Sequence, residues 1–128
     1  MNKTFIYEND EQLQQALAEW QKILRLQDWI IKASIRRERD MYLANSSAAV
    51  RYNYEKRMAF IHIMDPIDYE PDLMVPQDME ISLVHELLHL HYAGFDQTEK
   101  GTIEYALVEQ SIEAISRALV ELKRSGQR

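Results

Sequence analysis

Apolar and polar residues in the first half of the chain follow two different periods. Residues 11–26 repeat apolar side chains every three or four positions, which predicts an amphipathic helix that Asn9 or Asp10 can cap. Residues 29–36 alternate between apolar and polar, which predicts a half-buried strand. Two β-prone runs, 48–54 and 58–64, flank a short polar turn and predict a β-hairpin.

The second half of the chain predicts a loop followed by two helices. Residues 65–76 contain three prolines and three aspartates, which interrupt any periodic pattern. A helix is predicted from a cap at Asp78 to about Tyr92, with Gly94 as its stop, and another over residues 102–123. Residues 124–128 are expected to be disordered. Together these elements predict one α+β domain over residues 1–128, with a small twisted sheet of three to four strands packed against helices.

The helix that Asp78 caps contains the sequence His-Glu-x-x-His at residues 85–89. Four residues apart on a helix, His85 and His89 lie one above the other, so both imidazoles could bind one metal ion. Glu86 lies about 100° further round the helix, where it is better placed to take a proton from a water molecule than to bind the metal. A shuffled chain of this composition contains the pattern roughly 0.01 times.

The residues around this motif indicate that its helix is buried. The two histidines and Glu86 form a narrow polar stripe with apolar residues on both sides. Buried polar groups need partners, and a metal would provide one. The alternative is a core helix whose histidines are hydrogen-bonded without a metal. His91 lies on the far side of the helix near Glu80 and is expected at the surface, whereas His62 is expected to have a local partner within a strand.

Composition narrows the classes of protein and site. The chain has no cysteine, so any zinc must be bound by histidine and carboxylate. A net charge of −6 argues against a nucleic-acid partner. No apolar run approaches the ~18 residues of a membrane span, and the first ten residues lack the apolar region of a signal peptide. The prediction is a cytoplasmic protein without a membrane partner.

A catalytic zinc needs three protein ligands, so a third must lie outside the motif. Phe95 stands where a third histidine would extend the motif, which leaves the acids of the last predicted helix as candidates: Glu104, Glu109, Glu113 and Glu121. Glu109 and Glu113 run along the edge of the apolar stripe and repel one another at this spacing unless a cation offsets the repulsion. We favour Glu109 as the ligand and Glu113 as the hydrogen-bond acceptor of a ligand histidine. The alternative is two glutamates at the margin of a solvated face.

Residues 85–89 together with Glu109 and Glu113 resemble the gluzincin metallopeptidases, to which thermolysin belongs. Glu109 follows His89 by 20 residues, a spacing similar to thermolysin's, and the order of the predicted elements is similar to the minigluzincins and small phage-type metallopeptidases. Val108 departs from the asparagine that usually precedes the ligand glutamate. The resemblance implies a zincin-like fold and one zinc ion per chain, held by His85, His89 and Glu109.

The resemblance also implies a reaction. Such enzymes hydrolyse peptides or proteins, with the glutamate of the motif, here Glu86, as general base. They stabilise the oxyanion with a histidine or tyrosine, for which Tyr92 and Tyr105 are the nearest candidates in sequence. An edge strand of the hairpin could hold the substrate extended. The alternative is a non-catalytic or latent protein-binding module. In it, His62, His91 or a chain-terminal acid closes a structural zinc site, or residues 65–76 cover the cleft.

Overall fold

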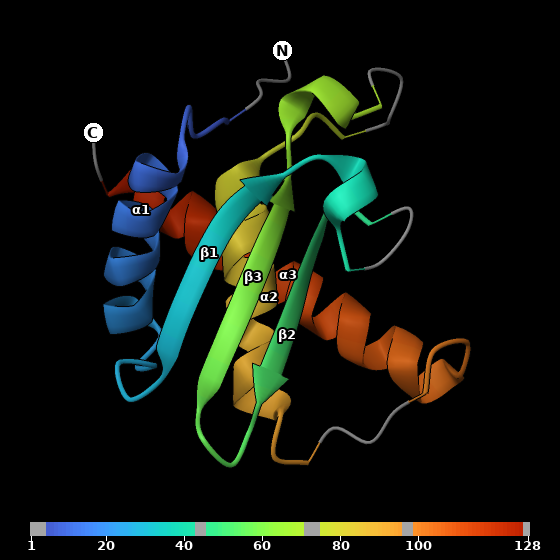
Figure 1. Cartoon of the computed structure of the whole chain (residues 1–128). Coiled ribbons are helices and arrows are strands. Elements are labelled where there is room, and N and C mark those ends of the chain that lie inside the picture. The colour runs from blue at the N-terminus through green and yellow to red at the C-terminus, as the bar shows by residue number, and fades with distance from the viewer. Residues whose placement is uncertain (1–4, 43–45, 71–74, 96–98, 127–128) are drawn as a thin grey trace.

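The computed structural model describes residues 5–42, 46–70, 75–95 and 99–126, which form a mixed α+β arrangement of three helices and a three-stranded sheet (Figure 1). The elements are, in order, α1 Asp10–Ile23, β1 Ile30–Arg36, η1 Glu38–Asp40, β2 Ala48–Asn53, β3 Met58–Met64, η2 Pro66–Asp68, α2 Met79–Tyr92 and α3 Ile103–Ser125. The predicted α+β class, hairpin and helices are confirmed. No helix in the described ranges is long and apolar enough to cross a bilayer.

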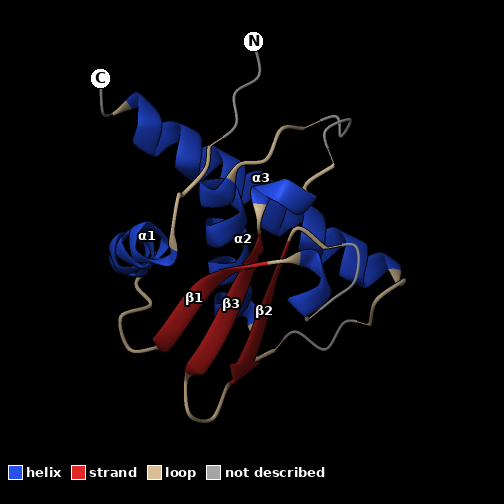
Figure 2. Cartoon of the chain, turned by 45° about the horizontal axis from the view of Figure 1, so that its top comes forward, coloured by secondary structure: helices blue, strands red, loops and turns tan. Residues whose placement is uncertain are grey.

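The sheet has β3 at its centre, with β1 parallel to it on one side and β2 antiparallel to it on the other. All three helices lie on one face of this sheet (Figures 1 and 2). Helix α1 packs beside β1, α2 crosses β2 and β3, and α3 lies against α2. The strand β2 is therefore an edge strand that borders the space between the sheet, α2 and α3.

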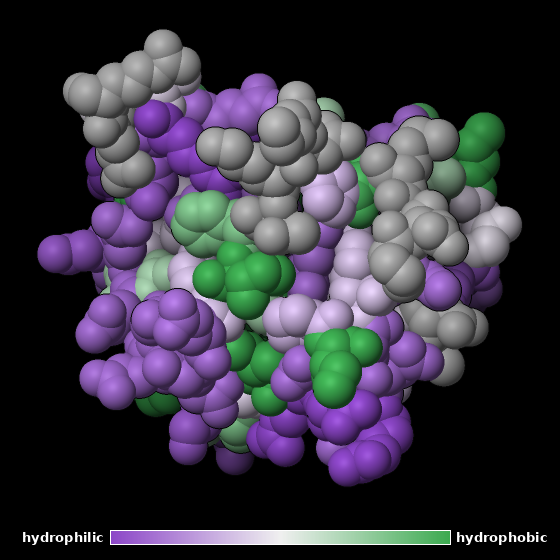
Figure 3. Space-filling model, turned by 90° about the horizontal axis from the view of Figure 1, so that it is seen from above, coloured by the Kyte–Doolittle hydropathy of each residue, from purple (hydrophilic) through white to green (hydrophobic). Residues whose placement is uncertain are grey.

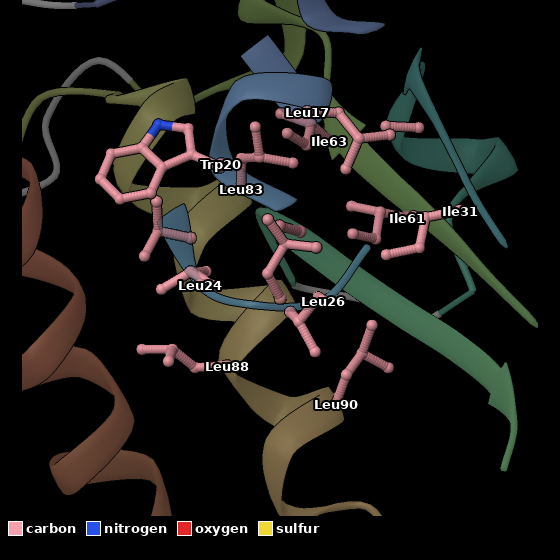
Figure 4. Packing of buried hydrophobic residues seen from close by; sticks show 14 of the residues in the cluster. Leu17, Trp20, Leu24, Leu26, Ile31, Ile61, Ile63, Leu83, Leu88 and Leu90 are labelled. Atoms are coloured by element: carbon pink, nitrogen blue, oxygen red, sulfur yellow. The ribbon is translucent and has the colours of Figure 1, made fainter. Parts of the chain in front are cut away.

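The core lies between the sheet and the helices (Figure 4). Alternation along the strands turns Ile31, Ile61 and Ile63 toward the helices, where α1 contributes Leu17 and Trp20. Helix α2 buries apolar residues on both sides of its polar stripe, as its sequence predicts: Leu83, Val84, Leu87, Leu88 and Leu90. Because both flanks of α2 are fixed by packing, the direction in which the polar stripe faces is fixed too.

The opposite face of the sheet is open, and its residues Ile30, Met58 and Phe60 are exposed. His62 also lies on this face, buried under the ring of Tyr42 at a centroid distance of 3.9 Å. Its Nδ1 has no hydrogen-bond partner within the described residues, and burial lowers its pKa. The local partner of His62 is thus a stacked ring, on the side of the sheet away from α2. Seen from above, polar side chains cover most of the surface, with a few separate apolar groups between them (Figure 3).

Two predicted helix ends are wrong. The first helix ends at Ile23 instead of residue 26, because Arg25 adopts a left-handed backbone conformation with φ of 61°. The last helix continues to Ser125, so the predicted disorder of residues 124–128 is wrong for Arg124 and Ser125. Arg124 donates hydrogen bonds of 2.9 and 3.0 Å to Asp78, which hold the end of α3 at the start of α2. Residues 127 and 128 lie outside the described residues.

Gly94 follows α2 as predicted, although a positive φ is not the reason. A Cβ atom at this position would lie 2.8 Å from the hydroxyl oxygen of Tyr54, which comes from the turn of the hairpin. Any other residue here would require the Tyr54 side chain to move. The hairpin therefore packs against the end of α2, and this contact helps to place β2 alongside the polar stripe of the helix.

Candidate metal centre

Helices α2 and α3 bring the three predicted metal ligands together. The Nε2 atom of His85 lies 3.0 Å from Oε2 of Glu109, and the Nε2 atom of His89 lies 3.1 Å from Oε1 of the same carboxylate. One ligand atom from each of these three residues lies within 4.8 Å of the ligand atoms of the other two. Glu109 thus spans both histidines, with one oxygen facing each ring.

Capping and packing set up this arrangement. The carboxylate of Asp78 accepts a hydrogen bond of 3.0 Å from the backbone N–H of Ile81, which starts α2 about two turns before His85. The hydroxyl of Thr102 likewise accepts from the backbone N–H of Tyr105 and starts α3. Helices α2 and α3 run in opposite directions. Glu109, near the start of α3, contacts His89 near the end of α2, whereas Arg124, at the end of α3, contacts Asp78 at the start of α2.

The donor set fits a divalent cation such as zinc. Two ligands on one zinc ion lie roughly 3.3 Å apart when bonds of about 2.0–2.1 Å meet at the tetrahedral angle. The two contacts between a histidine nitrogen and a glutamate oxygen, 3.0 and 3.1 Å, are close to that separation. Two neutral imidazoles and one carboxylate also form the ligand set expected of a catalytic zinc in a chain without cysteine.

His85 is oriented by carboxylates on both of its ring nitrogens. Its Nδ1–H donates to Oε1 of Glu113 at 2.8 Å, and its Nε2 faces Glu109. Burial lowers the pKa of His85, but the hydrogen bond to Glu113 and the charges of Glu86 and Glu109 outweigh burial, so that its pKa is raised overall. Without a metal, a protonated His85 satisfies both contacts. A cation at Nε2 would take the place of that proton, while Glu113 keeps the tautomer that binds it.

Glu86 is buried beside the ligand cluster and lines the adjoining cleft. Burial raises the pKa of Glu86 to about 7. The negative charges of Glu109 and Glu113 also raise this pKa, whereas the charge of His85 lowers it. A carboxyl group that binds and releases a proton near neutral pH is suited to general acid–base catalysis. Its position therefore agrees with the role that the spacing of the motif predicts.

Glu113 connects the cluster to a residue that the sequence analysis missed. Its Oε2 accepts a hydrogen bond of 2.8 Å from Nε of Arg117, while its Oε1 accepts from His85. These contacts lower the pKa of Glu113: the hydrogen bond to His85 contributes most, burial opposes it, and the charge of Arg117 adds to it. The i,i+4 spacing of Glu113 and Arg117 was the available signal for this pair.

The candidate metal centre opens into a cleft of about 530 Å³ between β2, α2, α3 and the segment after η2. Of the two tyrosines predicted as oxyanion stabilisers, Tyr105 lines this cleft. Tyr92 does not line it and instead packs on Phe95, with ring centroids 5.6 Å apart. The cleft also contains Tyr52 and Tyr69, which sequence reasoning missed because neither lies near the motif in sequence.

The remaining candidates lie away from the cluster. His91 is exposed, as predicted, and its Nε2–H donates to the carbonyl oxygen of Leu24 at 2.7 Å. Glu104 and Glu121 are exposed on α3. Part of the predicted covering loop, residues 71–74, lies outside the described residues. Tyr69 and Val75 on either side of that gap both border the cleft.

No protein-family model matches the chain, and neither a curated protein nor a solved structure matches it. A functional assignment therefore depends on the chemistry of the site.

The two glutamates of α3 should contribute unequally to metal affinity. We expect Glu109→Ala to weaken zinc binding more than Glu113→Ala, because the first removes a direct ligand and the second removes only a partner of His85. Loss of such a partner typically weakens metal affinity 10–100-fold. Competition titration with a zinc-binding dye measures both variants. A greater loss in Glu113→Ala would reverse the two roles.

Proposed function

We propose that this protein is a zinc-dependent metallopeptidase with a zincin-like fold of the gluzincin type. The observation that carries the proposal is the carboxylate of Glu109 on α3, which spans His85 and His89 on α2. Glu86 lies beside these ligands, buried and open to the same cleft. A pair of core histidines that is only hydrogen-bonded to Glu109 would require neither the buried Glu86 beside them nor the cleft.

The side chains divide the chemistry between them. When bound, zinc would polarise the substrate carbonyl and lower the pKa of water to about 7. Glu86 takes the proton of the attacking water and passes it to the leaving amine. Glu113 accepts the Nδ1–H of His85 and so keeps that ring in one orientation. Tyr105 is the candidate for stabilising the oxyanion, because it lines the cleft and Tyr92 does not.

The edge strand β2 offers a way to hold an extended peptide. The N–H of Met64 donates to the carbonyl oxygen of Ser47 at 2.9 Å, so by the alternation of antiparallel pairs residues 48, 50 and 52 direct their backbone groups away from β3. The side chains of Val50 and Tyr52 line the cleft. A peptide added to this edge as a further strand would lie across the cleft, in front of the metal centre.

The test is cleavage of a mixed peptide library by the purified protein, analysed by mass spectrometry. We expect about one zinc per chain and cleavage that a chelator abolishes and added zinc restores. The His85→Ala/His89→Ala double variant is the matched control, and it should neither retain zinc nor cleave. Zinc retained in the double variant refutes the metal site. Zinc bound by the wild type without any cleavage favours the non-catalytic or latent module instead.

A further inference from the structure

Arg117 is a cation in the cleft whose place the proposed mechanism does not explain. It lies on α3 one helical turn beyond Glu113, and it lines the cleft together with Tyr69. Among the described residues that line the cleft, it is the one arginine, and no lysine lines it. The side chain is 40% exposed, so solvent and ligands reach it from the cleft.

The contacts of Arg117 leave part of its guanidinium group available. Its Nε and Nη2 atoms both lie 2.8 Å from one atom, Oε2 of Glu113. Its Nη1 has no hydrogen-bond partner within the described residues. Guanidinium is a planar fork with five N–H donors, so one edge can hold Glu113 while the other donates to an incoming carboxylate.

The acidic residues Asp78 and Glu113 in the cleft do not cancel the attraction of Arg117 for an anion. Asp78 also lines the cleft, but both of its oxygens accept hydrogen bonds from Arg124. Glu113 is shared between His85 and Arg117. The carboxylates of Asp78 and Glu113 are thus both engaged by hydrogen-bonding partners, which reduces their repulsion of a second carboxylate.

We propose that Arg117 selects substrates that carry a carboxylate at its end of the cleft, an inference that rests on the proposed peptidase function. Along α3, Arg117 follows Glu109, which contacts His89, and precedes Arg124, which contacts Asp78 at the start of α2. Arg117 therefore lies between the metal ligands and the start of α2. The strand β2 begins at that same end (Figure 1). In a peptide antiparallel to β2, residues after the scissile bond lie there. The carboxylate is an acidic side chain or the free C-terminus.

The experiment compares pairs of peptides that differ only in a carboxylate. One pair has glutamate or glutamine shortly after the scissile bond, and the other has a free or an amidated C-terminus. The peptides are built on a sequence cleaved in the library, or on an alanine-rich sequence if none is cleaved. We measure kcat/KM and the Kd for zinc-loaded protein with wild type, Arg117→Gln and Arg117→Lys. The pair that shows the preference identifies the source of the carboxylate.

For the wild type we expect a preference of about 10-fold to 100-fold for the carboxylate, the range of one charge-assisted hydrogen bond. Arg117→Gln should bring this ratio close to one, and Arg117→Lys should retain part of it because the charge remains without the fork. If Arg117 acts only by holding Glu113 and His85, the variants lower kcat/KM for both members of a pair equally. An unchanged ratio, or no preference in the wild type, overturns the inference.

The two measurements separate this inference from the proposed function. Tighter binding of the carboxylate peptides without cleavage supports the role of Arg117 and counts against the peptidase. Cleavage without preference supports the peptidase and overturns the role of Arg117. If no peptide is bound or cleaved, both are overturned.

Discussion

Glu86→Gln should retain the fold and the zinc ion but lose peptide hydrolysis by about 10²–10⁴-fold in kcat. The amide of glutamine is nearly isosteric with the carboxyl group but cannot accept the proton of the attacking water. Glu86 lies outside the cluster of His85, His89 and Glu109, so metal affinity does not require it. The measurement is kcat on a peptide that the wild type cleaves, together with zinc content and circular dichroism.

The matched control for this variant is Glu104→Gln. It makes the same chemical change at an exposed glutamate in the first turn of α3, and its activity should equal that of the wild type. Equal turnover by the wild type and Glu86→Gln would reject the role of Glu86 as general base. Loss of zinc from Glu86→Gln would mean that Glu86 supports the metal site directly.

Local periodicity was sufficient to predict the helix that carries the motif. The apolar residues on both sides of its polar stripe predicted a buried helix, and α2 is buried on both flanks. The i,i+4 spacing of His85 with His89 and of Glu109 with Glu113 depends only on helix geometry, so the sequence sufficed to nominate all four. The structure adds that Glu109 faces both histidines and Glu113 faces His85.

Contacts between residues distant in sequence could not be predicted. The parallel pairing of β1 with β3 joins strands separated by β2, and no local pattern specifies it. The cleft residues Tyr52 and Tyr69 come from separate segments of the chain, and only the tertiary fold places them beside the ligands. The stop of α1 depends on Arg25, a residue without the steric freedom of glycine.

Glu80 is the clearest of these unpredicted contacts. Its position opposite the motif suggested the surface near His91, but its side chain is only 4% exposed. Its carboxylate accepts hydrogen bonds from Nε1 of Trp20 at 2.9 Å, Nζ of Lys123 at 3.1 Å and Nη2 of Arg124 at 3.0 Å. One buried acid thus joins α1, α2 and the end of α3. Because α3 also carries Glu109, this cluster helps to fix the register of α3 against α2, which carries His85 and His89.

Glu80→Ala should therefore lower the free energy of unfolding by about 2 kcal/mol, because it leaves a buried hydrogen-bond donor without its acceptor. The indole N–H of Trp20 would be buried without an acceptor, whereas Lys123 and Arg124 keep contacts to Glu19 and Asp78. Urea titration followed by tryptophan fluorescence measures the loss. Glu121→Ala, at an exposed position on α3, is the control and should change stability by less than about 0.5 kcal/mol. Equal stability of the two variants would show that the cluster does not hold the three helices together.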